Sequence, residues 1–383
     1  MKVVIQPGKL NGTAAVPPSK SYAHRMLIGA VLAEGECQVE GISDSEDMLA
    51  TRGCMQALRG SGIFSCRESG STLRFFIPLA LAVRGEGIFT GTPRLIERGI
   101  GIYEELFAGC GISVEKTADQ IRVQGQLKAG EYQIRGDVSS QFVTGMLFAL
   151  SVLKEDSRLK VLPPVESRPY IDITIDVMKK FGVTAEEKEP NTFVIRGGQK
   201  YQAGKYVVEG DWSNGAFLYA FNEVGSKLEI NGLNPESMQG DKKCLEYFRI
   251  LQDMDPDVID LSDTPDLGPV LFATAAALHG GRFTGIRRLR IKESDRVGAM
   301  AQELEKFGVT CRISENEMEI ISFGLQKPAE PLDGHNDHRI VMALSILASL
   351  TGATILGAEA VAKSWPDYFH VLQDAGMDLM NVD

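Results

Sequence analysis

The strongest constraint on how this chain folds is an apolar stretch of helical length that recurs six times along its 383 residues. Each copy opens on Ser, Thr, Asn or Asp, side chains that accept hydrogen bonds from the free N–H groups of a first helical turn. The interiors are apolar nearly all round, which is typical of buried helices. The six segments are residues 21–32, 69–83, 139–153, 213–224, 264–278 and 336–350.

A short β-like stretch and then an amphipathic helix follow most of these segments. The stretches are residues 35–39, 87–91, 157–162, 225–230, 281–286 and 352–356. In the fifth unit Val297, Met300, Leu304 and Phe307 recur at helical spacing. Several of these outer helices end at a glycine suited to a left-handed cap, namely Gly60, Gly109, Gly182, Gly308 and Gly376. No unit can cover its own apolar helix, so the units must pack together.

Six such units divide naturally into three and three. The chain length fits two domains or one large one, at ~150 residues per domain. We expect a first lobe over residues 16–209 and a second over residues 1–15 and 210–383, with an N-terminal strand at residues 3–5. The predicted fold class is α/β (α+β), with two pseudo-threefold lobes. The alternative is a set of ordinary α/β units whose spacing coincides.

Composition narrows the possible partners. With 40 Lys and Arg against 51 Asp and Glu, the net charge is −11, which repels nucleic acid and anionic membranes unless cations gather locally. The apolar runs are too short for a signal peptide or for a span of ~18 residues, so we expect a cytoplasmic protein.

Six scattered cysteines without a CxxC pair predict reduced thiols. His335 and His338 lack partners for a metal set, so no metal is predicted. Neither ATP-binding nor nicotinamide-binding motifs occur in their required context.

Cations and small polar residues gather at the starts of the buried helices. Helices lying side by side would direct their free N–H groups and partial positive charge toward one place, which favours anions. Each serine can equally be a plain helix cap. The residues are Lys20, Ser21, His24 and Arg25 at the first start, Ser69, Gly70, Ser71 and Arg74 at the second, Ser139, Ser140 and Gln141 at the third, and Asp337, His338 and Arg339 at the sixth.

Further charged residues stand on the approaches to the outer helices. The run at residues 287–290 can be a solvated face, whereas Glu293 between Lys292 and Arg296 indicates a charged site. Asp266 is either an N-cap or a general acid or base. The cations on these approaches are Arg98, Arg168, Arg288, Arg290, Lys292, Arg296 and Lys363.

Nine motifs in a fixed order carry a resemblance to a known family. They are PSKSYAHR (18–25), SGSTLRF (69–75), SSQF (139–142), ESRPYIDIT (166–174), EGDWS (209–213), DTPD (263–266), IKESDR (291–296), NDHR (336–339) and AKSWPDY (362–368). From end to end, the chain resembles the 5-enolpyruvylshikimate-3-phosphate synthase family, also called 3-phosphoshikimate 1-carboxyvinyltransferases.

The resemblance implies two lobes of three βαβαββ units with buried parallel helices, an inside-out α/β barrel. It implies transfer of the enolpyruvyl group of phosphoenolpyruvate to the 5-hydroxyl of shikimate 3-phosphate, on the route to aromatic amino acids. The hydroxyl loses a proton as it adds to C2, C3 gains one, and the tetrahedral intermediate expels phosphate. The two anionic substrates are the implied partners, no cofactor is implied, and a monomer is expected by analogy. We expect the lobes to close on shikimate 3-phosphate.

The resemblance also implies roles for individual residues. The implied catalytic groups are Lys20, Asp266, Lys292, Glu293 and His338, with Asp266 and Lys292 at the hydroxyl and Glu293 at the methylene carbon. The implied contacts to shikimate 3-phosphate are Ser21, Arg25, Ser139, Ser140, Gln141, Ser167, Tyr170, Asp266 and Lys292. The implied contacts to phosphoenolpyruvate are Lys20, Gly70, Arg98, Gln141, Arg296, Arg339 and Lys363.

Two positions depart from the family pattern, and two other functions stay open. Glu68 stands where an Asn is usual, and Arg288 stands where some members carry Asn. A carboxylate at Glu68 should repel phosphoenolpyruvate unless Arg67, Arg74 or another cation pairs with it, which affects substrate affinity and the response to glyphosate-type inhibitors. The alternatives are a sister transferase acting on UDP-N-acetylglucosamine, to whose reactive loop cysteine Cys110 is a poor match, and a non-catalytic anion-binding protein of the same fold.

Overall fold

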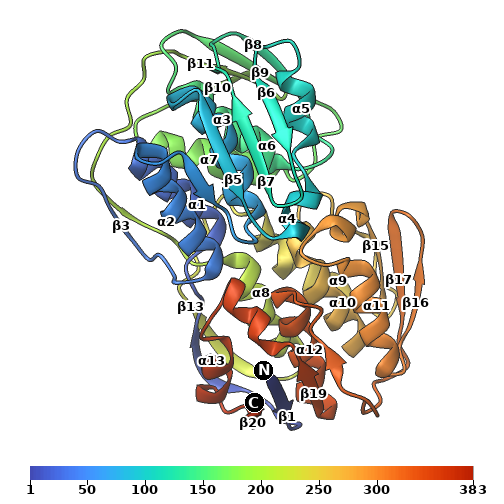
Figure 1. Cartoon of the computed structure of the whole chain (residues 1–383). Coiled ribbons are helices and arrows are strands. Elements are labelled where there is room, and N and C mark those ends of the chain that lie inside the picture. Colours follow the sequence, from blue (N-terminus) through green and yellow to red (C-terminus); the bar gives the residue numbers. More distant parts are fainter. Residues whose placement is uncertain (383) are drawn as a thin grey trace. The chain divides into compact units, whose positions relative to one another are not determined.

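Two compact units make up the chain in the computed structural model, which describes residues 1–382 (Figure 1). The first unit is the continuous segment Lys20–Val208, coloured blue to green. The second unit combines residues 1–19, in dark blue, with the chain from Glu209 onward, in yellow-green to red. Each unit has a hydrophobic core of its own.

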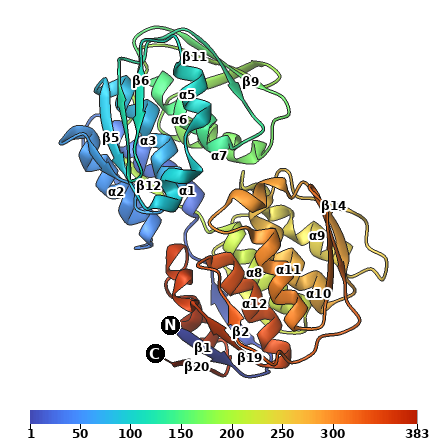
Figure 2. The same ribbon diagram turned by 45° about the vertical axis from the view of Figure 1, so that its right-hand side comes forward.

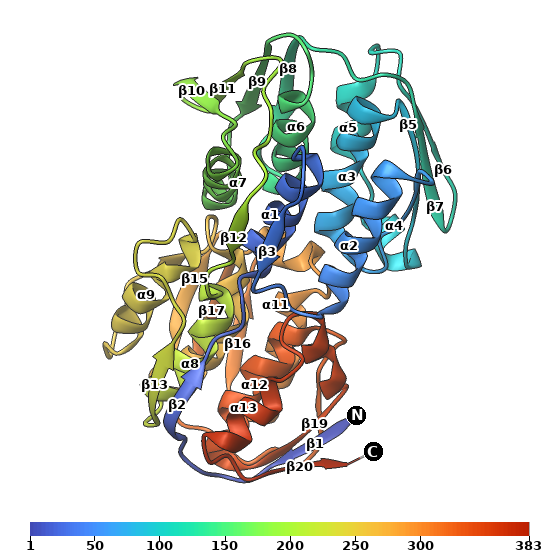
Figure 3. The same ribbon diagram turned by 90° about the vertical axis from the view of Figure 1, so that its left-hand side faces the viewer.

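Three buried helices form the centre of the first unit, and outer helices and strands cover them (Figure 3). The buried helices are α1 (Lys20–Leu32), α3 (Gly70–Val83) and α6 (Ser140–Ser151). The outer helices are α2 (Glu46–Arg59), α4 (Pro93–Arg98), α5 (Gly101–Phe107) and α7 (Arg168–Lys180). The strands are β3 (Gln38–Glu40), β4 (Ile63–Ser65), β5 (Glu86–Thr90), β6 (Ser113–Lys116), β7 (Gln120–Gln124), β8 (Glu131–Arg135), β9 (Ser157–Leu162), β10 (Ala185–Glu189), β11 (Thr192–Ile195) and β12 (Lys205–Val207).

The second unit has the same plan (Figure 2). Its buried helices are α8 (Trp212–Glu223), α10 (Gly268–Ala277) and α12 (His338–Thr351). Its outer helices are α9 (Cys244–Leu251), α11 (Arg296–Lys306) and α13 (Tyr368–Asp374), with 3₁₀ turns at Gly240–Lys243, Pro265–Leu267, Arg287–Ile291 and Ala358–Lys363. The strands are β1 (Lys2–Ile5), β2 (Asn11–Ala15), β13 (Lys227–Asn231), β14 (Ile259–Asp260), β15 (Gly281–Thr284), β16 (Thr310–Ile313), β17 (Glu317–Ile321), β18 (Leu332–Asp333), β19 (Ala353–Leu356) and β20 (Leu379–Val382).

The repeat expected from the sequence is also seen in the strand order of the sheets. Four sheets share one pattern, in which the first two strands are parallel and the next two join antiparallel: β4-β5-β7-β6, β8-β9-β11-β10, β14-β15-β17-β16 and β18-β19-β1-β20. Equivalent apolar pairs face each other across the second and third strands, at Phe89↔Ile121, Leu159↔Phe193, Phe283↔Met318 and Ile355↔Val3. All eight side chains are buried, so each sheet turns one face to the helices.

In each unit, one parallel pair joins strands that are distant in sequence. In the first unit β3 pairs in parallel with β12, and in the second β2 pairs in parallel with β13. The N-terminal strand β1 fills the third place of the last sheet, between β19 and β20. The second unit is therefore complete only with the first residues of the chain.

Close helix packing in the first unit depends on one glycine. A Cβ on Gly145 of α6 would collide with the backbone oxygen of Arg74 in α3 and with the hydroxyl of Tyr103. That hydroxyl donates to the carbonyls of Arg74 (2.7 Å) and Phe142 (3.0 Å), so it joins α3 and α6 through their backbones. Any side chain at Gly145 would separate the two helices.

The expected mixed α/β fold is confirmed: all six buried helices and the strands after them are present. The fifth helix differs at its start, because a 3₁₀ turn, Pro265–Leu267, precedes α10. Asp266 lies inside that turn and caps no helix, so its expected alternative role as N-cap is wrong. The expected left-handed cap at Gly60 is also wrong, because its φ is −121°, while Gly62 has a φ of +73°. None of the helices within residues 1–382 is long and apolar enough to cross a membrane.

Candidate functional site

In the first unit, two arginines lie against the start of α3. Ser69 caps this helix by accepting from the N–H of Thr72. A Cβ built on Gly70 would stand 3.0 Å from Nη1 of Arg74 and 3.3 Å from Nη2 of Arg98. The absence of a side chain at Gly70 therefore lets both guanidinium groups approach the backbone at a helix N-terminus.

Gln141 connects this cation pair to the start of α6. Its Oε1 accepts from Arg74 Nη1 at 2.6 Å, and its Nε2 donates to the Ser71 hydroxyl at 2.9 Å. The buried Nε of Arg98 has no hydrogen-bond partner within residues 1–382. A partly buried cation with an unused donor beside a helix start is suited to an anion.

Arg25 of α1 ties three helices together. Its guanidinium donates to Thr174 Oγ1 at 2.8 Å, to the Tyr170 carbonyl at 3.0 Å, to Thr144 Oγ1 at 3.2 Å and to the Ser21 carbonyl at 2.7 Å. Burial lowers the pKa of Arg25 to about 10, so the side chain stays charged at neutral pH. It therefore fixes the backbone at two predicted substrate contacts, Ser21 and Tyr170.

The remaining predicted contacts of the first unit lie at the starts of α6 and α7. Ser139 caps α6 by accepting from the Gln141 N–H at 3.3 Å, and Ser140 is buried behind it. Ser167 takes a left-handed conformation, with φ +56°, just before α7. Arg168 instead pairs with Asp172 and Glu187, so it holds the first turn of α7 to the strand β10.

Sequence reasoning missed the partner of Lys20. The Lys20 ammonium lies 3.0 Å from Oδ2 of Asp47 in the first turn of α2. Acidic residues are common in a first helical turn because they complement its partial positive charge. Asp47 therefore carried no signal that set it apart from an ordinary helix start.

In the second unit, the charged residues converge on Arg296, whose side chain is only 1% exposed. Its guanidinium donates to Asp337 at 2.8 Å, to Asp266 at 2.9 Å and to Glu293 at 2.7 Å. Burial alone would lower the pKa of Arg296, but these carboxylates raise it above its ordinary value. The charged site expected from Glu293 between Lys292 and Arg296 is therefore an ion-pair network centred on Arg296.

Asp266 is contacted by two further cations. Nη2 of Arg339 lies 3.1 Å from Oδ2, and Nζ of Lys292 lies 3.4 Å from Oδ1. Burial lowers the pKa of Lys292, although the Asp266 carboxylate acts in the opposite direction. The Lys292 amine is therefore easier to deprotonate than an ordinary lysine.

The start of α12 is built on Asp337, a fully buried residue that entered the sequence argument only as part of a helix start. Its carboxylate accepts from the Arg339 N–H at 3.0 Å and from the Ser294 hydroxyl at 3.0 Å, besides Arg296. His338 is buried beside it. The ammonium of Lys363 donates to the Asn336 carbonyl at 2.7 Å, so all these residues meet at one helix start.

A second buried acid, Asp241, was also missed. Its carboxylate accepts from the Ser213 hydroxyl at the start of α8. Burial and the neighbouring Asp266 carboxylate raise the pKa of Asp241 to about 7. A lone Asp in the sequence MQGDKK gives no sign of burial, because only the fold removes it from water.

The predicted site residues thus fall into two groups, one in each unit. The first unit holds Lys20, Ser21, Arg25, Gly70, Arg98, Ser139, Ser140, Gln141, Ser167 and Tyr170. The second unit holds Asp266, Lys292, Glu293, Arg296, His338, Arg339 and Lys363.

The two departures from the family pattern have different surroundings. Arg288 is buried and donates to the Ser262 carbonyl at 2.7 Å, so it is not part of a solvated face. Arg287 does lie on an exposed face, paired with Glu315. Near Glu68, Arg67 pairs with Glu46, and Arg74 binds Gln141.

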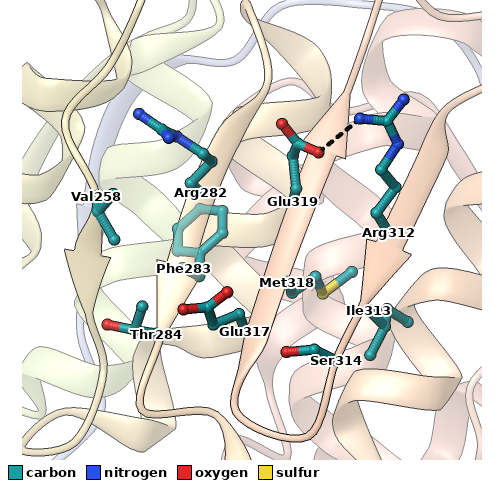
Figure 4. A pocket seen from close by; sticks show the side chains of 10 residues that line it. All are labelled: Val258, Arg282, Phe283, Thr284, Arg312, Ile313, Ser314, Glu317, Met318 and Glu319. Atoms are coloured by element: carbon teal, nitrogen blue, oxygen red, sulfur yellow. Dashed lines mark hydrogen bonds and ion pairs between the residues drawn. The ribbon is translucent and has the colours of Figure 1, made fainter.

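One hollow of about 380 Å³ lies away from these residues, on the sheet of β14 to β17. Arg312 and Glu319 pair at 3.2 Å across β16 and β17, and Figure 4 shows Arg282 on the neighbouring strand β15. The lining includes none of the predicted site residues. Within residues 1–382, no group of His, Cys, Asp and Glu is arranged to hold a metal ion.

The fold is that of an α/β protein with two units of repeated sheets. Because cations gather at buried helix starts in an otherwise acidic chain, this protein is suited to multiply charged anionic ligands. A family model described as EPSP synthase (3-phosphoshikimate 1-carboxyvinyltransferase) matches residues 4–65 and 61–372. The chain belongs to the EPSP synthase family.

Relatives and solved structures agree with this membership. Proteins named 3-phosphoshikimate 1-carboxyvinyltransferase from Clostridium perfringens and Clostridium kluyveri are 35% and 37% identical, each over 98% of this chain and 98% of their own length. An EPSP synthase structure from Acinetobacter baumannii is 22% identical over 99% of this chain and all of that chain, with a TM-score of 0.78. The last comparison supports the fold.

Proposed function

We propose that this chain transfers the enolpyruvyl group of phosphoenolpyruvate to the 5-hydroxyl of shikimate 3-phosphate and releases inorganic phosphate. The reaction belongs to the biosynthesis of aromatic amino acids. The observation that carries the proposal is family membership over almost the whole chain, at 35–37% identity to proteins named for this activity. The two charged groups support it, because both substrates are multiply anionic.

For phosphoenolpyruvate, we propose contacts that are mostly cations. The pair formed by Arg98 and the backbone at Gly70 supports this role, because the buried Arg98 Nε has unused donor capacity in the part of the chain that the structure describes. The proposed contacts are Lys20, Gly70, Arg98, Gln141, Arg296, Arg339 and Lys363.

For shikimate 3-phosphate, the proposed contacts combine a buried cation with hydroxyl groups. Arg25 and the serines at the starts of α6 and α7 can bind phosphate and sugar-like hydroxyls. The proposed contacts are Ser21, Arg25, Ser139, Ser140, Gln141, Ser167, Tyr170, Asp266 and Lys292.

The proposed chemistry moves one proton off the 5-hydroxyl and one onto C3 of phosphoenolpyruvate. At the hydroxyl, Asp266 and Lys292 are the proposed groups, supported by their separation of 3.4 Å and by the lowered pKa of Lys292. At C3, Glu293 is the proposed donor and acceptor, with Lys20 and His338 assisting. The ion pair of Glu293 with Arg296, at 2.7 Å, stabilises the negative carboxylate, which suits it to accept the proton from C3 when the intermediate collapses. For the addition step, Glu293 must first take up a proton that it then donates to C3, and the ammonium of the assisting Lys20 is the proposed source of that proton.

We further propose that residues 16–209 form one lobe and residues 1–15 and 210–383 the other, with three repeat units each. The two-unit division of contacts supports this assignment. We also propose a monomer in the cytoplasm, and the six free thiols support the location because reduced cysteines are usual there.

Phosphate release from the purified protein tests the proposed function. Phosphate should appear with both substrates present, and it should not appear when either one is omitted. UDP-N-acetylglucosamine replaces shikimate 3-phosphate in a parallel assay, where no release is expected. Release with that acceptor alone would favour the sister transferase, and no release with any acceptor would favour a binding protein.

A further inference from the structure

A fully buried carboxylate, Glu303, lies outside the proposed catalytic and binding residues. It sits on α11, with its side chain 0% exposed. Its oxygens accept from Lys306 Nζ at 2.8 and 3.0 Å, from the Asp333 N–H at 2.9 Å and from His335 Nε2 at 3.1 Å. Burying an ionised carboxylate is unfavourable unless it is paired, so these three partners stabilise Glu303 in the folded protein.

Glu303 and Arg296 hold the same short segment from one face of α11. They are seven residues apart, which is about two helical turns and returns the side chain to the same face. Arg296 binds Asp337 at 2.8 Å, and Glu303 binds the N–H of Asp333 and the ring of His335. Because α11 packs beside α12 in the second unit, it holds residues 333–337 at two points (Figure 2).

This segment has an unusual backbone. His335 and Asn336 are both left-handed, with φ of +48° and +51°. Left-handed residues other than glycine persist where their surroundings hold them. Here the His335 N–H donates to Asp333 Oδ1 at 2.7 Å, and its ring is held by Glu303.

Two proposed contacts to phosphoenolpyruvate depend on the same turn. The Asn336 carbonyl accepts from Lys363 Nζ at 2.7 Å, and the residue after it, Asp337, caps the helix start that carries Arg339. A change in the direction of the turn would therefore move both cations, although neither touches Glu303.

We propose that Glu303 and His335 form a positioning pair that sets the start of α12 for phosphoenolpyruvate. The inference rests on the proposed function for its substrate. The pair holds a left-handed turn, the turn sets Lys363 and Arg339, and these cations bind the anion. A purely structural pair would stabilise the unit without changing the affinity of the correctly folded protein.

The test compares Glu303→Gln with Glu305→Gln, an exposed residue of the same helix. The glutamine can place its amide NH2 at either of the two carboxylate oxygen positions. At one position the NH2 faces Lys306 and the His335 ring, and at the other it faces Lys306 and the Asp333 N–H. In both cases a donor is turned toward groups that themselves donate. We expect KM for phosphoenolpyruvate to rise about tenfold in Glu303→Gln, with KM for shikimate 3-phosphate changed less than about twofold. Unchanged KM values for both substrates would overturn the proposal, even if the melting temperature falls.

His335 supplies the second arm, because its side chain is 21% exposed and its replacement is less disruptive to the core. His335→Ala should raise KM for phosphoenolpyruvate as Glu303→Gln does, and His335→Gln, which keeps an N–H donor, should restore most of the affinity. The double variant should be little worse than the poorer single variant, because both remove one contact. Additive losses, or no rescue by glutamine, would contradict a pair.

A measurement without substrates separates this inference from the proposed function. Amide hydrogen exchange over residues 334–341 should be faster in Glu303→Gln and His335→Ala than in Glu305→Gln. If wild-type protein released no phosphate, the proposed function would fail while this comparison still tested the positioning pair. Equal exchange in all three variants would overturn the pair, whatever the activity.

Discussion

Arg296 donates from Nε to the carboxylate of Asp337 at 2.8 Å, and both side chains are almost completely removed from water, at 1% and 0% exposure. The pair joins the start of α11 to the start of α12. Breaking it by removing one member leaves the other charge buried with a weaker set of partners, which costs more than losing an exposed pair.

We therefore expect Asp337→Ala to lower the free energy of unfolding by about 3 kcal/mol, since it also removes the cap of α12. Urea unfolding at pH 7.5 measures the change. Glu315→Ala, which breaks the exposed pair with Arg287, is the control and should change stability by less than about 1 kcal/mol. Equal effects of the two substitutions would contradict the buried network.

Lys20→Met and Arg339→Ala should lower turnover by roughly 10²-fold or more, because each removes a charge proposed to face an anionic substrate. Phosphate release measures turnover, and circular dichroism verifies that the variants are folded. Arg287→Ala is a matched loss of an exposed cation and should leave turnover unchanged. Near-normal turnover in either of the first two variants would remove that residue from the proposed site.

His24 should make the protein sensitive to acid. Burial, with Lys20 and Arg25 nearby, lowers the pKa of His24 well below its ordinary value of 6.5. As the pH falls below about 6.5, the unfolded chain takes up a proton that the folded chain refuses, so stability falls by up to about 1.4 kcal/mol per pH unit. Wild type should lose stability relative to His24→Gln between pH 7 and pH 5 in urea unfolding. Parallel curves for the two proteins would show that His24 does not titrate in this way.

Asp241 should act with the opposite sign. Its pKa is raised from an ordinary value of 3.8 to about 7, so between these values the folded chain holds a proton that the unfolded chain has lost. The stability that this proton contributes is present at low pH and is lost as the pH rises through 7. Wild type should therefore lose stability relative to Asp241→Asn between pH 5 and pH 8. Asp255→Asn, an exposed control, should follow wild type.

The pattern of apolar residues was sufficient to predict the buried helices and their strands, because burial on every side leaves a helix without a polar face. Cap identity was harder to predict. Asp211 and Asp337 cap α8 and α12, where the sequence suggested Ser213 and Asn336, since several capping residues stand side by side and only the backbone selects one. The end of α2 was ambiguous for the same reason. Gly60 and Gly62 both follow the helix closely, and only Gly62 has a positive φ.

The sequence predicted the cations of the candidate site and three of their carboxylate partners, Asp266, Glu293 and Asp337, but it missed the partner of Lys20 and two further buried acids. Asp47, Asp241 and Glu303 occur in ordinary acidic or mixed sequences, and their importance comes from burial or from a partner distant in the chain. The sequence predicted no metal at His335 and offered no other role for it, whereas in the structure its ring contacts Glu303 at 3.1 Å. Such pairings depend on which elements pack together, and local sequence does not contain that information.

The N-terminal strands have a consequence for biosynthesis on the ribosome. All strands of the first unit come from one uninterrupted stretch, so it can fold as soon as β12 has been made. In contrast, β1 precedes the other described strands along the chain but hydrogen-bonds to β19 and β20, which follow them all. The nascent chain must therefore carry β1 without these partners until β19 and β20 have been made, and the second unit closes only then.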